Sequence, residues 1–194
     1  MKKFFAYITI IRPLNVILGG VTIVISSFIV QYNGPISYVF FAVLVVMFYT
    51  AGANTLNDYF DYKIDKINRP ERAISSGLVL RNHAIIFSLF AFILGTLFAL
   101  QLNKNSQLVA VGVSLPLIIG YNAKLKNLPL IGNIVVALIL SLSFVYAGFV
   151  FDNIKPLIIP AVLAFGLTLI REIIKDMADV IGDKSVGLKT FPII

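Results

Sequence analysis

Acidic residues in this chain gather in two short segments, and this arrangement could bind divalent cations. Eight of the nine Asp and Glu residues lie in segments 58–71 and 172–183, and only Asp152 lies elsewhere. Carboxylates are costly near hydrocarbon, about 2.5–3.5 kcal/mol each at the centre of a membrane helix. Several oxygen ligands of one sign need a positive counter-charge, which a hard cation supplies. The two segments therefore predict cation binding.

The first acidic segment has the spacing of one helix face. Asn57, Asp61 and Asp65 follow each other at intervals of four residues, and Asp58 lies three and seven residues before Asp61 and Asp65. Residues separated by three, four or seven positions share a face of an α-helix. We therefore expect these side chains to point their oxygens towards one place.

The second acidic segment repeats this spacing with Asp176, Asp179 and Asp183, and Glu172 lies four residues before Asp176. Two such sets facing each other could hold a pair of Mg²⁺ ions bridged by a phosphorylated ligand, since Mg²⁺ combines a few carboxylates with water and phosphate. The alternative is that these are ordinary charges beside the membrane, paired with neighbouring Lys and Arg. The matched spacing of two sets favours the metal site.

Basic side chains lie between the acids. Arg69 and Arg72 follow the first acidic segment, whereas Lys124 and Lys126 lie with Tyr121 in the segment YNAKLKN. Guanidinium and ammonium groups are suited to phosphate oxygens. The mixture of acids and bases is typical of a site for a metal–diphosphate complex, although membrane anchoring by positive charge is the simpler alternative.

The rest of the sequence is typical of a membrane protein. It is 59% hydrophobic and 13% charged, whereas soluble domains are about 25% charged. Backbone groups in lipid must be satisfied within helices, so we predict an all-α, multi-spanning transmembrane helical bundle in a single domain, 1–194. About 20 apolar residues cross the bilayer as a helix, and six segments qualify: 14–32, 36–56, 84–101, 106–122, 129–150 and 156–174. Pro116 and Pro160 fall inside two of them and predict kinks.

The positive charge is distributed as in a membrane protein rather than a nucleic-acid-binding protein. The formal net charge is +7, but 14 of the 16 Lys and Arg residues fall on one predicted face of the membrane, with Lys104 and Lys155 opposite. The positive-inside rule makes the first face cytoplasmic. Both acidic segments lie on it, so we expect a site facing the cytoplasm in the cell membrane and no nucleic-acid partner.

Four elements in order resemble the UbiA-type intramembrane prenyltransferase superfamily. NDYFDYKIDKINRPERAISSG resembles its first signature, and REIIKDMADVIGDKSVGLKTFPI resembles its second. YNAKLK and the opening RPLN are similar to two further elements. The residues that carry the resemblance are Asn57, Asp61 and Asp65, then Asp179 and Asp183, then Tyr121 and Lys126, and finally Arg12 and Asn15.

Within the superfamily, the form NDxxDxxxDxxNRPxRxIxSG is most similar to the digeranylgeranylglyceryl phosphate synthases. The resemblance implies Mg²⁺-dependent transfer of a polyprenyl group, geranylgeranyl, from its diphosphate to a hydroxyl of a lipid acceptor, geranylgeranylglyceryl phosphate, in membrane ether-lipid synthesis. Asn57, Asp61 and Asp65 would hold one metal ion, and Asp179 and Asp183 the other. The implied roles of the remaining residues are diphosphate binding by Arg69, Arg72, Tyr121, Lys124 and Lys126, proton acceptance by Asp58 or Asp176, and a place in the acceptor site or cavity for Arg12 and Asn15.

The resemblance leaves other readings open. The superfamily usually has about nine spanning helices, so we expect this chain, with about six, to be incomplete at its C-terminus. A chlorophyllide-like molecule or an aromatic quinone precursor could be the acceptor instead. A cation transporter could also use the acidic segments, although transporter carboxylates usually lie near the middle of the bilayer.

Overall fold

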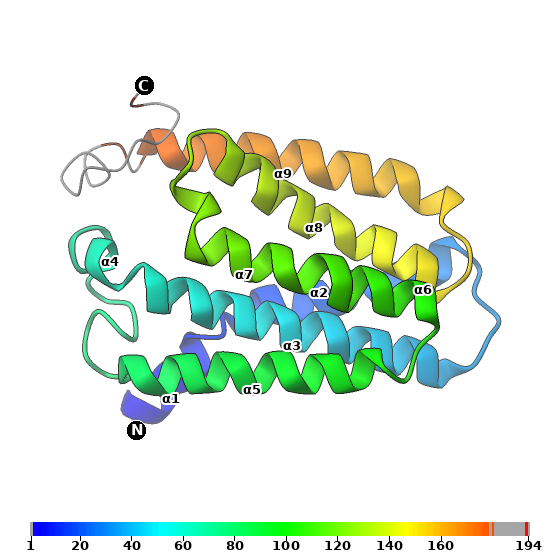
Figure 1. Cartoon of the computed structure of the whole chain (residues 1–194), viewed down its shortest axis with the longest axis horizontal. Coiled ribbons are helices and arrows are strands. Elements are labelled where there is room, and N and C mark those ends of the chain that lie inside the picture. Colours follow the sequence, from blue (N-terminus) through cyan, green and yellow to red (C-terminus); the bar gives the residue numbers. More distant parts are fainter. Residues whose placement is uncertain (1, 179, 181–192, 194) are drawn as a thin grey trace.

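In a computed structural model of the chain, residues 2–178, 180 and 193 are described, and all regular structure among them is helical. Six elements form the body of the bundle (Figure 1): α2 (Pro13–Ile29), α3 (Ile36–Phe60), α5 (Arg81–Ala99), α7 (Leu115–Ala123), α8 (Ile131–Val150) and α9 (Ile158–Ala178). Shorter elements join them: α1 (Lys2–Thr9), α4 (Tyr62–Asn68), α6 (Lys104–Gln107), a π-helix (Leu108–Ser114) and 3₁₀ turns at Leu125–Asn127 and Lys155–Leu157.

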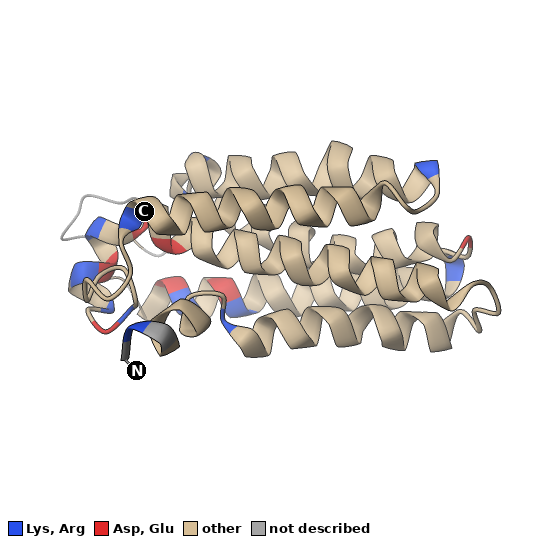
Figure 2. Ribbon diagram, turned by 90° about the horizontal axis from the view of Figure 1, so that it is seen from below, with Lys and Arg blue, Asp and Glu red and all other residues tan. Residues whose placement is uncertain are grey.

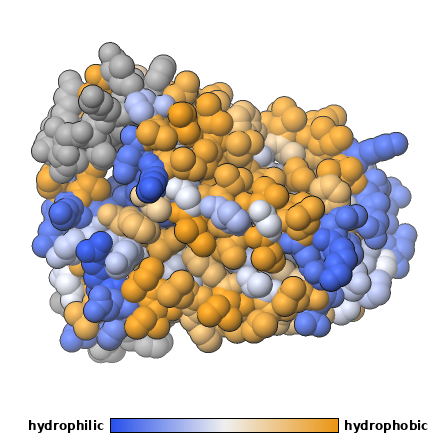
Figure 3. Space-filling view, viewed as in Figure 1, coloured by the Kyte–Doolittle hydropathy of each residue, from blue (hydrophilic) through white to orange (hydrophobic). Residues whose placement is uncertain are grey.

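Six helical stretches of the described chain are long and apolar enough to cross a membrane, which confirms the predicted number of spans. They are Phe5–Ile29, Ile36–Phe60, Arg81–Ala99, Lys104–Ala123, Ile131–Val150 and Lys155–Ala178. Apolar atoms cover the middle of the molecule and hydrophilic atoms gather at both ends (Figure 3). The chain is therefore an integral membrane protein.

The long helices pack in a definite order. Helix α3 lies between α5 and α2, α7 lies against both α3 and α8, and α9 packs on α8 at one edge (Figure 1). Two glycines bring α3 and α5 close together, as small residues do in membrane bundles. A Cβ atom on Gly52 would lie 2.7 Å from Phe92 Cε1, and one on Gly95 would lie 2.5 Å from Tyr49 Cδ1.

The fourth span widens before its proline. Pro116 has no N–H to donate and its ring clashes with the preceding turn. The turns before it form a π-helix over Leu108–Ser114, and Leu115 N–H donates to Ala110 O, five residues earlier. The sequence predicts a kink at Pro116, and the structure has a π-helix directly before this proline. Pro160, where the sequence also predicts a kink, lies in the first turn of α9, where proline is tolerated.

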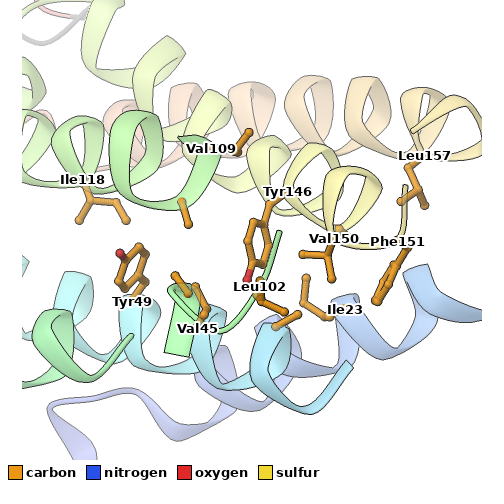
Figure 4. Close-up of a cluster of buried hydrophobic side chains, with 14 of the residues drawn as sticks. Ile23, Val45, Tyr49, Leu102, Val109, Ile118, Tyr146, Val150, Phe151 and Leu157 are labelled. Atoms are coloured by element: carbon orange, nitrogen blue, oxygen red, sulfur yellow. The ribbon is translucent and has the colours of Figure 1, made fainter. Parts of the chain in front are cut away.

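Charged side chains concentrate at one end of the bundle (Figure 2), where α3, α7 and α9 end and where α2, α5 and α8 begin. A small second hydrophobic cluster lies at this charged end, formed by Ala6, Ile10, Ala73, Ile74, Val79 and Ala84. It packs helix α1 against segment 69–80, which carries two of the predicted site arginines. The main core lies within the bundle and includes Ile23, Val45 and Tyr146 (Figure 4).

Candidate active site

A cavity of about 640 Å³ runs from the charged end into the bundle. Its deeper walls include Val45, Tyr49, Ile118, Ile139 and Tyr146, of which Figure 4 shows all but Ile139. Of the described residues, six cationic and four acidic side chains line its charged end: Arg12, Arg69, Arg72, Lys126, Arg171 and Lys175, with Asp61, Asp65, Glu172 and Asp176. One continuous space therefore joins a charged chamber to an apolar interior.

The first acidic segment enters this chamber at the junction of α3 and α4. Helix α3 ends at Phe60 and α4 begins at Tyr62, with Asp61 between them at φ −81° and ψ 2°. The junction bends the helix without interrupting its hydrogen bonding, because Asp61 N–H donates to Asn57 O (2.9 Å) and Asp65 N–H donates to Asp61 O (2.8 Å). The predicted repeat is kept, and all three side chains line the cavity.

Each acid at this junction has a basic partner. Arg12 Nη2 donates to Asp58 Oδ1 (2.6 Å) and to Asn57 Oδ1 (3.3 Å). Arg72 Nη1 donates to Asp65 Oδ2 (2.7 Å) and Asp58 Oδ1 (3.3 Å). The ammonium group of Lys126 pairs with Asp61. The predicted mixture of acids and bases is thus an ion-pair network that ties the start of α2, the junction of α3 and α4, the 3₁₀ turn Leu125–Asn127 and segment 69–80 together.

Burial sets the electrostatics of the Asp65–Arg72 pair. Burial raises the pKa of Asp65 above its ordinary value, although the hydrogen bond and charge of Arg72 act in the opposite direction. Burial alone would lower the pKa of Arg72, but the charge of Asp58, the hydrogen bond and charge of Asp65, and the charge of Asp61 raise it above its ordinary value. Arg72 therefore stays cationic, whereas the Asp65 carboxylate still gains from additional positive charge.

Helix α9 supplies the opposite wall of the chamber. Glu172 is only 5% exposed and accepts hydrogen bonds from Arg171 Nη2 (2.6 Å) and Lys175 Nζ (3.2 Å). Asp176 Oδ2 accepts a hydrogen bond from Asn133 Nδ2 (2.8 Å) at the start of α8. Asn133 was not among the predicted site residues, and its only signal was a polar residue at the start of an apolar span.

The structure brings most of the predicted residues together. Two predicted residues do not line the cavity: Lys124 is exposed, and Asp58 is buried behind the cavity wall. Asp179 and Asp183 lie outside the described residues. The predicted residues that line the cavity are Arg12, Asn15, Asn57, Asp61, Asp65, Arg69, Arg72, Tyr121, Lys126 and Asp176.

The described residues alone contain no cluster of three or more His, Cys, Asp or Glu side chains that could hold a metal ion. The donors that are present suit Mg²⁺ in type, because Asn57, Asp61 and Asp65 offer amide and carboxylate oxygens at one end of the same cavity. A metal ion held there would need further oxygen ligands, from a bound phosphate group, from water or from the second acidic segment.

Comparison with known proteins covers nearly the whole chain. The model of the UbiA prenyltransferase family matches residues 20–194. A digeranylgeranylglyceryl phosphate synthase of Methanothermobacter thermautotrophicus is 40% identical over 188 residues, which are 96% of this chain and 66% of that protein. A synthase of the same name from Pyrococcus horikoshii is 39% identical over 191 residues, 97% of this chain and 68% of that protein. The chain thus spans about two thirds of the length of these curated relatives.

Solved structures share the fold. A structure from work on digeranylgeranylglyceryl phosphate synthase in membranes has a TM-score of 0.84 and 31% sequence identity, and the match covers 100% of this chain and 69% of that one. A UbiA homolog from Archaeoglobus fulgidus, bound to DMAPP and Mg²⁺, has a TM-score of 0.81 at 21% identity and covers 96% of this chain and 68% of that one.

Proposed function

Because this chain belongs to the UbiA prenyltransferase family, we propose that it transfers a geranylgeranyl group from its diphosphate to a hydroxyl of geranylgeranylglyceryl phosphate. The observation that carries this proposal is the single cavity that joins a charged chamber to an apolar interior. A prenyl diphosphate likewise joins a charged diphosphate group to an apolar chain. The curated relatives whose alignments cover nearly all of this chain are named for the product of this reaction.

The charged chamber suits the donor's diphosphate. Among the described residues its lining carries six cationic side chains beside four acidic ones, so several cationic groups are available to phosphate oxygens. Arg69, Arg72 and Lys126 would bind phosphate oxygens, and guanidinium forks are well matched to that task. Electrostatic stabilisation of the departing diphosphate is the kind of contribution that usually dominates such barriers.

Mg²⁺ would be held by Asn57, Asp61 and Asp65, and by Asp179 and Asp183 of the second acidic segment. When bound, it would neutralise charge on the diphosphate as the bond between carbon and oxygen breaks. The acids of the chamber already have basic partners, so we expect the metal to bind together with the diphosphate. In that event Lys126 and Arg72 would be released from Asp61 and Asp65 to contact phosphate oxygens.

The apolar interior fits a donor of about geranylgeranyl length. Val45 lies twelve residues before Asn57 on α3, and Tyr146 lies thirteen residues after Asn133 on α8, so the cavity is about 18–20 Å deep at 1.5 Å per residue. An extended chain advances about 3.5 Å for every three bonds, so the roughly sixteen main-chain carbons of a geranylgeranyl group would span about 18 Å.

The reaction breaks one C–O bond and makes another. The donor's C1–O bond breaks and diphosphate leaves, then the acceptor oxygen bonds to C1 and loses its proton. The apolar walls would exclude water from the allylic cation. Asp176 lines the cavity beside Asn133 and is the proposed proton acceptor. We further propose that the chain forms one transmembrane domain in the cell membrane, with the charged end facing the cytoplasm.

The test is a transfer assay on the purified protein in detergent. Labelled geranylgeranyl diphosphate and geranylgeranylglyceryl phosphate are incubated with Mg²⁺ or with EDTA. We expect a metal-dependent ether product that is lost in Asp61→Asn and in Asp183→Asn but kept in Glu71→Gln, an exposed acid of the same segment that does not line the cavity. Release of diphosphate only with an aromatic or chlorophyllide-like acceptor would reassign the acceptor. Metal-dependent ion flux in vesicles, without diphosphate release, would replace the enzyme by a transporter.

A further inference from the structure

Asp58 lies where two arginines of the chamber meet, but not in the chamber itself. It is 4% exposed in the last turn of α3. Its Oδ1 atom accepts from Arg12 Nη2 at 2.6 Å and from Arg72 Nη1 at 3.3 Å. Both arginines line the cavity, whereas Asp58 is absent from the lining. The carboxylate therefore holds the two guanidinium groups from behind the wall.

The two arginines reach Asp58 from segments that are distant in the sequence. Arg12 immediately precedes α2, and Arg72 belongs to segment 69–80. Arg72 also pairs with Asp65, at 2.7 Å, whereas Arg12 pairs with Asp58. Loss of Asp58 would therefore displace Arg12 more than Arg72.

The backbone at Arg12 has an unusual conformation. Arg12 adopts φ 54° and ψ 72°, a left-handed conformation that is unfavourable for a residue other than glycine, and Pro13 follows it as the first residue of α2. Such strain persists only where the surroundings fix it. Here the backbone is held by hydrogen bonds from Arg12 N–H to Thr9 O (3.0 Å) and from Asn15 N–H to Arg12 O (2.9 Å), and the side chain leaves it towards Asp58 and Asn57.

We propose that Asp58 is a positioning residue, which holds Arg12 and Arg72 at the cavity wall so that their guanidinium groups bind the donor's diphosphate. This inference rests on the proposed function. It replaces the expectation that Asp58 accepts a proton. A general base must lie within hydrogen-bond reach of the proton that it takes, and the Asp58 carboxylate is directed to two guanidinium groups behind the lining.

The two roles predict different kinetics. A positioning residue affects the binding of the diphosphate, so Asp58→Asn should raise the KM for the prenyl diphosphate at least tenfold while kcat falls much less. It should weaken the binding of inorganic pyrophosphate with Mg²⁺ by a similar factor, which needs no turnover to measure. A general base would instead lower kcat, leave pyrophosphate binding unchanged, and remove the acidic limb of the pH profile, because a base is inactivated by protonation at low pH.

A double-mutant cycle makes the test specific to the arginine contact. Arg12→Gln and Asp58→Asn should each weaken pyrophosphate binding, and the double variant should lose less than the sum of the two single losses, because the Arg12 contact can be lost only once. Glu71→Gln is the control for loss of an acid near the chamber, and Asp58→Glu should restore part of the affinity. Thermal unfolding of each variant verifies that it is folded.

The outcomes separate the inference from the proposed function. Additive losses in the cycle, or a fall in kcat with unchanged pyrophosphate binding, would overturn the positioning role while leaving the prenyltransferase proposal intact. If the unmodified protein neither binds pyrophosphate with Mg²⁺ nor transfers a prenyl group, the proposed function fails and the positioning role fails with it.

Discussion

Ser114→Phe should shorten the prenyl chain that the cavity accepts. Ser114 lines the cavity at the end of the π-helix. It lies seven residues before Tyr121, which lines the cavity at the end of α7, so Ser114 is about 10 Å from that level along the span. The cavity continues past it to Ala110 and Tyr146. A phenyl ring at this position would obstruct the deeper half.

The size of the effect follows from chain length. About 10 Å holds roughly nine extended bonds, enough for a geranyl group, whereas a geranylgeranyl group needs about 18 Å. Overpacking a filled site costs about 1–3 kcal/mol, equivalent to about 5–150-fold in kcat/KM. We expect that loss for geranylgeranyl diphosphate, a smaller one for farnesyl diphosphate, and a change within about twofold for geranyl diphosphate.

The assay compares kcat/KM for the three donors with one acceptor. Val113→Phe is the matched control, because Val113 is the neighbouring residue in the same π-helix, is 39% exposed and does not line the cavity. Equal losses for all three donors, or the same selectivity change in Val113→Phe, would refute the assignment of the deep cavity to the prenyl chain.

Three further outcomes are expected. Gly95→Ala should lower the melting temperature, because the new Cβ would lie 2.5 Å from Tyr49 Cδ1 and such a clash costs about 1–3 kcal/mol. Gly166→Ala is the control, since no atom lies within 4 Å of its Cβ position, and it should leave the melting temperature unchanged. Equal melting temperatures for the two variants would contradict the close packing of α3 and α5. Lys126→Met should raise the KM for the donor at least tenfold, because Lys126 lines the cavity. Lys124→Met should leave this KM within twofold, because Lys124 is exposed and does not line the cavity, and steady-state kinetics of both variants test the difference. Mg²⁺ and pyrophosphate added together should raise the melting temperature more than the sum of their separate effects, since a ligand that binds only the folded state stabilises it; strictly additive shifts would show that the two bind independently.

The spans and the spacing of the acids could be predicted from the sequence because both depend on local physics. Continuous apolar runs must become helices in lipid, and the i, i+4 repeat of Asn57, Asp61 and Asp65 survives the bend at Asp61 because the backbone hydrogen bonds continue through it. The contacts between distant segments could not be predicted in this way. Nothing in the sequence around Asp58 shows that its carboxylate accepts a hydrogen bond from Arg12, 46 residues away.

The cavity itself was equally hidden from sequence reasoning. Asn133 and Glu172 contribute to its wall through the packing of α8 on α9, and no periodicity within either helix specifies which neighbour it meets. The distortion at Pro116 was foreseeable from the chemistry of proline, but its form was not. A π-helix needs room for its wider turns, and that room is set by the packing of neighbouring helices, which the local sequence does not specify.

The pairing of Arg12 with Asp58 also bears on how the protein is made. Arg12 is synthesised before Asp58, so this ion pair can form as soon as α2 and α3 pack against each other. Asp61 must wait longer, because Lys126 emerges only after two more spans have been synthesised. The order of residues along the chain thus sets the order in which these ion pairs can form, with Arg12–Asp58 before Lys126–Asp61.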